Sequence, residues 1–204
     1  MATADWGSLD LGGTIGTLHA GAKLRVAHWP GAPDGPGTVI LVQGRAECIE
    51  FYAETIEDLR RLGFAVITFD FRGQGGSERK AKRGGHIDSF RQYGDDLIAV
   101  VRYAHQLGLP RPYTLLAQSM GGAAALLAMP ILAKDVSRMV LMAPLIEIAK
   151  LPMAPRLVTI LSNLLCIMGF SRSPVRGPAP PKSTDTFPGN PLTSDRQRYE
   201  KLCQ

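Results

Sequence analysis

The chain has 204 residues, of which 45% are hydrophobic and 20% charged, and its mean hydropathy is +0.02. These values are typical of a globular protein and exclude both a disordered chain and one made mainly of membrane spans. The net charge is +5, but no zinc finger, aromatic-basic RNA motif or repeated basic helix accompanies it, so we expect no nucleic-acid partner.

Cysteine usage and the N-terminal sequence favour a cytoplasmic protein. Cys48, Cys166 and Cys203 are odd in number and widely spaced, which predicts reduced thiols rather than a disulfide framework or a zinc site. The first twenty residues lack a basic segment followed by an apolar one, so no signal peptide is expected. The sequence predicts no cofactor and no metal.

Apolar runs alternate with helical periodicities from residue 38 onward, which predicts parallel strands joined by crossover helices. Continuous apolar runs of this kind are typical of strands covered on both faces. We expect strands at residues 38–43, 64–70, 113–118 and 137–144, of which the first, second and fourth are expected to be buried. The helix after the third strand is expected to be kinked or interrupted at Pro130.

The alternation ends after residue 144. A helical stripe of apolar residues runs from Met153 to Met168, interrupted by polar residues that exclude a membrane span. It is either a core helix or a helix that lines a lipid pocket or rests on a membrane surface. The proline-rich stretch that follows predicts no regular element.

The stretch LLAQSMGG (115–122) places a serine at the end of an apolar run. Ser119 is either an ordinary helix N-cap or a nucleophile on a sharp strand-to-helix turn. Such a turn needs small residues two before and two after the serine, and Ala117 and Gly121 meet this need, with Gly122 following. Met120 then begins the helix, where its N–H group can face a developing oxyanion.

A second oxyanion donor is expected in QGRAE (43–47), directly after the first predicted strand. Gly44 would let the backbone approach, and Arg45 would donate its N–H group.

The glycines of FRGQGGSERK (71–80) raise the alternative of a phosphate-binding loop. The third glycine of a dinucleotide fingerprint would fall on Glu78, and no P-loop lysine follows, so this alternative is rejected. We expect Asp70, Arg72 and Ser77 to organise a tight loop beside the site. The basic run RKAKR (79–83) is either a solvated loop or a contact for an anionic phospholipid surface.

Five motifs in this order resemble those of bacterial lysophospholipases in the α/β-hydrolase superfamily, a group that includes monoacylglycerol lipases and serine aminopeptidase-like hydrolases. The motifs are QGRAE, FDFRGQGGSERK, GGHIDSFRQYGDDL, AQSMGGAAAL and LTSDRQRYEK. The resemblance implies an α/β fold with a mostly parallel sheet, Ser119 as nucleophile, and Arg45 and Met120 as oxyanion donors. Two positions depart from the family pattern: Ala117 replaces a glycine, and Gln43 stands where many relatives carry histidine.

The resemblance also implies a catalytic acid and a histidine after Ser119. All four histidines precede it: His19, His28, His86 and His105. Three aspartates follow it, none placed like the family acid: Asp135, Asp185 and Asp195. His86 is expected to order its loop rather than to act as a base. We therefore expect a hydrolase core at 1–144 and a cap segment at 145–204, truncated before the strands that carry the acid and histidine, and inactive alone.

Three functions remain open at this stage. The first is a serine hydrolase of carboxylic esters, of the lysophospholipase or monoacylglycerol lipase type, with a lipid or other ester as substrate. The second is a peptidase or small-ester hydrolase on the same fold. The third is a non-catalytic lipid-binding protein. Peripheral contact with an anionic membrane, at its inner face, is also expected.

Overall fold

The structure is a computed structural model that describes residues 12–80, 85–147, 153–170, 187, 195 and 196. By its internal contacts the chain divides into two units, one formed by Trp6–Ile148 and the other by Met1–Asp5 together with Ala149–Gln204. The first unit contains the sheet and is described first.

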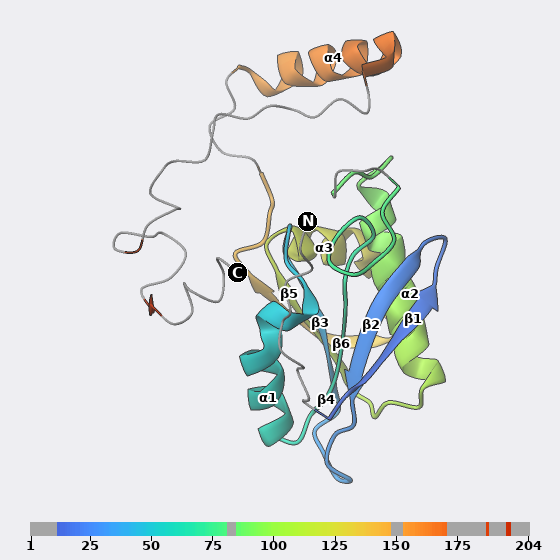
Figure 1. The fold of residues 1–204 in the computed structure, drawn as a ribbon, viewed down its shortest axis with the longest axis vertical. Helices are drawn as coiled ribbons and strands as arrows, with labels where there is room; N and C mark the ends of the chain where they lie inside the picture. The colour runs from blue at the N-terminus through green and yellow to red at the C-terminus, as the bar shows by residue number, and fades with distance from the viewer. Residues whose placement is uncertain (1–11, 81–84, 148–152, 171–186, 188–194, 197–204) are drawn as a thin grey trace. The chain divides into compact units, whose positions relative to one another are not determined.

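The sheet has six strands in the order β1-β2-β4-β3-β5-β6 (Figure 1). The strands are β1 (Thr14–His19), β2 (Lys23–Trp29), β3 (Thr38–Val42), β4 (Ala65–Phe69), β5 (Tyr113–Gln118) and β6 (Val136–Met142). β1 and β2 pair antiparallel, and β2 pairs antiparallel with β4. β4, β3, β5 and β6 are mutually parallel, which confirms the predicted mostly parallel sheet.

Helices cover both faces of the sheet. They are α1 (Ala53–Arg61), preceded by a 3-10 turn (Ile49–Tyr52), α2 (Arg91–Gln106) and α3 (Met120–Leu132). α1 packs on one face through Ile56, against Leu41 and Val66 of the strands. α2 and α3 pack on the other face around a core that includes Ile40, Leu97 and Ala124. The carboxyl ends of β3, β4 and β5 therefore meet at one edge of a three-layered unit, the edge at which open α/β sheets bind ligands.

Two features of the first unit differ from the expectation. The hairpin of β1 and β2 was not predicted from the sequence. α3 includes Pro130 and ends at Leu132 without an interruption. A proline removes its own N–H bond and crowds the carbonyl four residues back, and at Pro130 only two helical residues remain beyond it.

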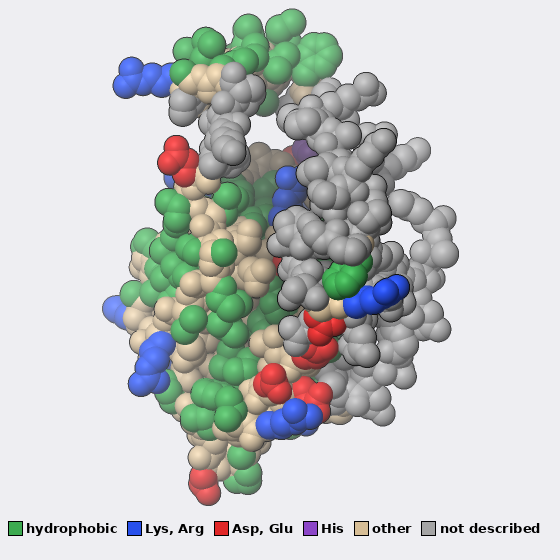
Figure 2. Space-filling model, turned by 90° about the vertical axis from the view of Figure 1, so that its left-hand side faces the viewer, with side chains coloured by type: hydrophobic (Ala, Val, Ile, Leu, Met, Phe, Trp, Pro, Cys, Tyr) green, Lys and Arg blue, Asp and Glu red, His purple; other side chains and the backbone are tan. Residues whose placement is uncertain are grey.

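β6 lies at the edge of the sheet and pairs only with β5 among the described strands. Its expected burial on both faces is wrong, because Val140 is 49% exposed and Met142 is 36% exposed. Three apolar residues of α3 are also exposed: Leu126, Leu127 and Ile131. Figure 2 shows one face of the molecule, on which hydrophobic side chains cover much of the described surface.

The second unit contains α4 (Pro155–Leu165), followed by a π-helical turn (Cys166–Phe170). A proline in the first turn suits a helix start, because its missing N–H would have no intrahelical partner there. Among the helices that the structure describes, none combines the length and the hydropathy needed to cross a bilayer. Whether residues 145–204 form a cap stays a prediction.

Candidate active site

Ser119 lies between β5 and α3, at the N-cap position of the helix. Its backbone has φ 47° and ψ −116°, and its side chain makes no capping hydrogen bond. A positive φ is rare for a residue with a β-carbon and costs of order 1–3 kcal/mol, so the surrounding structure must impose it. The expected strained turn is therefore present, and helix capping does not explain the serine.

Hydrogen bonds from three directions hold the backbone of Ser119. Its N–H donates to Met142 O at 2.9 Å, which extends the pairing of β5 with β6. Its carbonyl oxygen accepts from Gly122 N at 3.0 Å and from Leu145 N at 2.9 Å. The serine is thus fixed between the sheet, the first turn of α3 and the segment after β6, while its side chain is partly exposed.

Close contacts with neighbouring backbone leave room only for small residues around Ser119. A β-carbon at Gly121 would lie 2.3 Å from Gln43 O and 2.6 Å from Val42 O, at the end of β3. One at Gly122 would lie 2.8 Å from Pro144 Cβ. Ala117 is fully buried in β5, so its methyl group is accommodated where the family pattern has glycine.

The segment after β3 forms a tight loop whose amides point in fixed directions. Gly44 N donates to Glu47 Oε2 at 2.6 Å, and Ala46, with φ 61°, donates its N–H to Gln74 Oε1. The carboxylate of Glu47 occupies the place that a side chain at residue 44 would need, since a β-carbon there would lie 2.8 Å from Oε2. Arg45 lies between these two held amides, and its side chain is exposed.

Met120 supplies the other N–H group expected to bind an oxyanion. It is the first residue of α3, and the first N–H groups of a helix have no intrahelical acceptor. The helix dipole adds partial positive charge at this end. Met120 and Arg45 come from the ends of β5 and β3, which are adjacent in the sheet.

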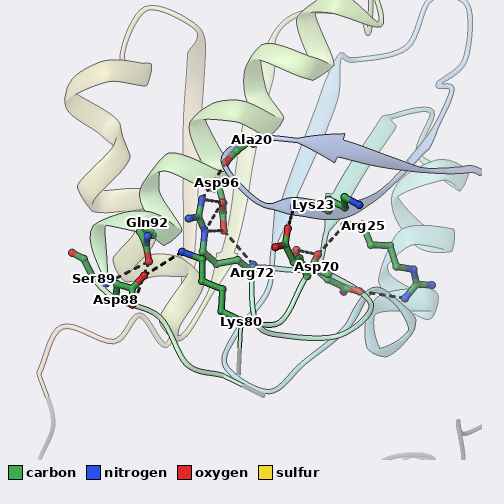
Figure 3. A network of polar contacts seen from close by, with 12 residues as sticks. Ala20, Lys23, Arg25, Asp70, Arg72, Lys80, Asp88, Ser89, Gln92 and Asp96 are labelled. Atoms are coloured by element: carbon green, nitrogen blue, oxygen red, sulfur yellow. Dashed lines mark hydrogen bonds and ion pairs between the residues drawn. The ribbon is translucent and has the colours of Figure 1, made fainter. Parts of the chain in front are cut away.

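Asp70 organises the loops at this edge, as Figure 3 shows in part. It is fully buried. Its carboxylate accepts from Ile49 N at 3.0 Å, Gly76 N at 2.8 Å and Gln43 Nε2 at 3.1 Å. Arg25 Nη1 lies 3.3 Å from Oδ2. These donors satisfy the hydrogen-bonding capacity of the buried carboxylate.

Gly75 and Gly76, after β4, lie against this carboxylate rather than around a phosphate. Gly75 has φ 48°, and a β-carbon there would lie 2.2 Å from Asp70 Oδ2. Ser77 Oγ closes the turn by donating to Asp70 O at 2.5 Å. The turn therefore encloses the carboxylate of Asp70, in the place where a phosphate-binding loop would hold a phosphate.

Arg72 ties the same loop to α2. Its Nε donates to Asp96 Oδ1 at 2.9 Å, and its Nη2 donates to Ala20 O at 3.2 Å (Figure 3). Hydrogen bonds to Asp96 raise the pKa of the Arg72 guanidinium above its ordinary value. Arg72 therefore stays charged and acts as a buried support, with no contact to Ser119 among the described hydrogen bonds.

His86 lines a small surface cavity with Arg72, Gly73 and Lys80. Its Nε2 lies 3.5 Å from Asp88 Oδ1, and Gly85 N donates to Gly73 O at 2.7 Å. Within the described residues, no hydrogen bond or ion pair joins His86 to Ser119. This placement fits the expected loop-ordering role.

Cys48 lies at the same edge of the sheet, in the loop after β3, but its thiol is not a ready nucleophile. Burial raises the pKa of the Cys48 thiol to about 12, so the thiol is protonated at neutral pH. The part of the chain that the structure describes holds no group of three or more His, Cys, Asp or Glu side chains placed to bind a metal ion.

The sequence missed Glu47, Gln74 and Asp96 as residues that hold the site. Glu47 and Gln74 fix the amides on either side of Arg45, and Asp96 anchors Arg72. Each lies within one of the five motifs. No local pattern predicts the partners of Gln74 and Asp96, because these contacts span 24 residues or more.

Solved structures with the same fold are α/β-hydrolases. A thermostable carboxyl esterase from Bacillus coagulans matches with a TM-score of 0.63 and 18% identity, over 84% of this chain and 61% of that one. A monoglyceride lipase from Saccharomyces cerevisiae matches with a TM-score of 0.58 and 22% identity, over 76% of this chain and 52% of that one. At these identities the likeness establishes the fold.

The chain belongs to the family described as Serine aminopeptidase, S33, whose model matches residues 34–201. It is 35% identical over 128 residues to a probable lysophospholipase L2 from Haemophilus influenzae, covering 62% of this chain and 41% of the relative. It is 44% identical over 87 residues to lysophospholipase L2 from Escherichia coli, covering 42% of this chain and 26% of the relative. The matches thus span less than half the length of these curated relatives.

Two glycine-to-alanine variants test the close contact between Gly121 and the end of β3. Gly121→Ala places a methyl group against the carbonyl oxygens of residues 42 and 43, so we expect the free energy of unfolding to fall by about 1–3 kcal/mol. Gly94→Ala in α2 is the matched control. A β-carbon at residue 94 would have Leu127 Cβ as its nearest neighbour, at 3.7 Å, and alanine stabilises a helix by about 1 kcal/mol relative to glycine. Urea unfolding measures both, and equal stabilities of the two variants would contradict the described contact.

Proposed function

We propose that Ser119 is the nucleophile of a carboxylic ester hydrolase of the lysophospholipase or monoacylglycerol lipase type. One observation carries the proposal: Ser119 occupies an N-cap position, yet it is held at φ 47° and its hydroxyl makes no capping bond. A serine that only capped a helix would adopt extended backbone and accept a bond from the first turn. Backbone strain of this kind is expected where the turn must direct a catalytic hydroxyl toward a substrate.

The reaction would proceed in two acyl-transfer steps. Ser119 Oγ attacks the ester carbonyl carbon while a base takes the hydroxyl proton, and the carbonyl electron pair moves onto oxygen. The N–H groups of Arg45 and Met120 would stabilise that oxyanion. Collapse breaks the ester bond, the leaving alcohol takes the proton, and water then releases the acid by the same route.

This mechanism needs a proton acceptor. Among these 204 residues no histidine follows Ser119, because all four histidines precede it. The family resemblance places the histidine and its acid partner after the cap. We therefore propose that these 204 residues alone turn esters over slowly, with an oxyanion hole that gives on the order of 10³-fold acceleration over water.

The names of the relatives support the substrate class. Two are called lysophospholipases, one structural neighbour is a monoglyceride lipase and another a carboxyl esterase. The family description also names an aminopeptidase, so aminoacyl anilides belong in the same substrate panel. We propose that a single-chain lipid ester is hydrolysed faster than a short ester or an anilide.

Added imidazole tests the nucleophile in the chain as it exists. Imidazole titrates near neutral pH and can act as the base that Ser119 needs. With a p-nitrophenyl acyl ester, we expect a rate that rises with imidazole concentration beyond the background of Ser119→Ala. The ester-release assay, run over a range of imidazole concentrations with both proteins, gives the Ser119-dependent rate by difference.

Two outcomes of that assay would contradict the proposal in different ways. Equal rates for the two proteins at every imidazole concentration would remove Ser119 as nucleophile and favour the non-catalytic lipid-binding protein. Ordinary enzyme rates without imidazole, lost in Ser119→Ala, would show that an upstream group already serves as the base.

We also propose peripheral contact with an anionic membrane. α4 and the turn after it carry one basic and no acidic residue, and the chain has five basic and no acidic residues between residues 148 and 184. Apolar side chains are exposed along α4, among them Leu157, Ile160 and Leu164. An apolar helix flanked by basic residues suits the interface of an anionic bilayer. Residues 81–83 of the basic run lie outside the described residues.

Within that run, Arg79 and Lys80 are described and exposed. Lys80 Nζ lies 3.2 Å from Asp88 Oδ2, an exposed pair worth little in water. Each basic residue near an anionic surface contributes about 1 kcal/mol. The double variant Arg79→Gln/Lys80→Gln should therefore bind phosphatidylserine-containing vesicles roughly thirtyfold more weakly at low salt.

Arg61→Gln on α1 is the matched control, because Arg61 is exposed and paired with Glu57. Vesicle co-sedimentation at low and high salt measures the binding. Equal binding to neutral and anionic vesicles at low salt would contradict membrane recognition by charge.

A further inference from the structure

Gln74 lies where three segments of the site meet. It follows β4, and its side chain is 5% exposed. Its Oε1 accepts the N–H of Ala46 in the loop after β3. Its Nε2 lies 3.5 Å from Tyr93 Oη in α2 and 4.0 Å from Met120 Sδ at the start of α3. One buried amide therefore contacts both segments that carry the proposed oxyanion donors.

The contact with Ala46 restricts the N–H of Arg45. Peptide groups are planar, so fixing one N–H fixes the whole plane between two residues. Glu47 holds the plane that ends at Gly44 N, and Gln74 holds the plane that ends at Ala46 N. The intervening plane, which carries Arg45 N–H, is connected to a held plane on both sides.

Gln74 is itself held firmly. Its backbone N donates to Phe71 O at 3.0 Å, and its carbonyl accepts from Ser77 N at 3.0 Å. The same turn is closed around Asp70, which also accepts from Ile49 N at the far end of the loop after β3. Gln74 is thus a rigid support rather than a mobile surface residue.

We propose that Gln74 is the positioning residue that keeps the N–H groups of Arg45 and Met120 directed at one oxyanion. This inference rests on the proposed function of Ser119. Gln74 supplies an acceptor for the loop and a neutral donor toward Met120. A carboxylate in its place would keep the acceptor but add negative charge beside the developing oxyanion.

Three variants separate these roles. Gln74→Met keeps the approximate volume and removes acceptor and donor. Gln74→Glu keeps the acceptor and adds charge. Gln92→Met is the matched control, because Gln92 Oε1 also accepts backbone N–H groups, those of Asp88 and Ser89, in a different loop.

The readouts are the amide-exchange rate of Ala46 by NMR and the rate of Ser119 labelling by a fluorophosphonate with imidazole present, followed by intact mass. For Gln74→Met we expect Ala46 to exchange at least tenfold faster and Ser119 to be labelled on the order of ten- to a hundredfold more slowly, less than the roughly 10²–10³-fold loss for complete removal of one oxyanion donor. Gln92→Met should match the unsubstituted chain in both readouts.

For Gln74→Glu we expect Ala46 to stay protected while labelling is slow at pH 8. The labelling rate relative to the unsubstituted chain should rise as the pH falls toward 5, because the carboxyl group gains a proton and becomes neutral. A purely structural role would not produce this pH-dependent ratio. If Gln74→Met fails to fold, the pH dependence of the labelling-rate ratio for Gln74→Glu tests the proposal.

Unchanged labelling of Ser119 in folded Gln74→Met, or a ratio for Gln74→Glu that is flat with pH, would overturn the proposal for Gln74 alone. Absence of labelling at Ser119 in the unsubstituted chain would instead contradict the proposed function, and with it the role given to Gln74.

Discussion

The first turn of α3 lies so close to the end of β3 that residue 121 has no room for a side chain, since a β-carbon would sit 2.3 Å from Gln43 O. This contact brings the helix start, the strand end and the loop after it together at one edge of the sheet. To enter the helix at this place, the chain must turn sharply at Ser119, which accounts for φ 47°. The strained serine, the N–H of Met120 and the loop of Arg45 all depend on that approach.

A layer of buried polar contacts supports the edge. Asp70, Arg72 and Gln74 all come from the segment after β4, and each reaches a different neighbour: the start of the 3-10 turn, α2 and the loop after β3. Buried charges are costly unless paired and hydrogen-bonded, so this segment can adopt few alternative arrangements. The result is a set of preorganised backbone donors, the condition under which electrostatic stabilisation of a transition state is effective.

The sequence predicted those parts of the structure that local physics decides. The strands β3 and β4 were predicted because side chains buried on both faces give continuous apolar runs. The apolar run of β5 also predicted a strand, although alternate residues of β5 are only partly buried. The turn at Ser119 was predicted because its steric demand falls on neighbouring residues. β1 was missed because it is mostly exposed and carries no such run. Gln74 was missed because its partners, Ala46 and Met120, are 28 and 46 residues away along the chain.

The central claim is that Ser119 faces a hole formed by the N–H groups of Arg45 and Met120. A crystal structure of the chain after covalent phosphonylation tests it most directly. The account predicts an adduct on Ser119 Oγ whose phosphoryl oxygen lies roughly 2.7–3.1 Å from both backbone nitrogens. An unmodified Ser119, or an adduct whose phosphoryl oxygen points to solvent and bonds neither nitrogen, would contradict it.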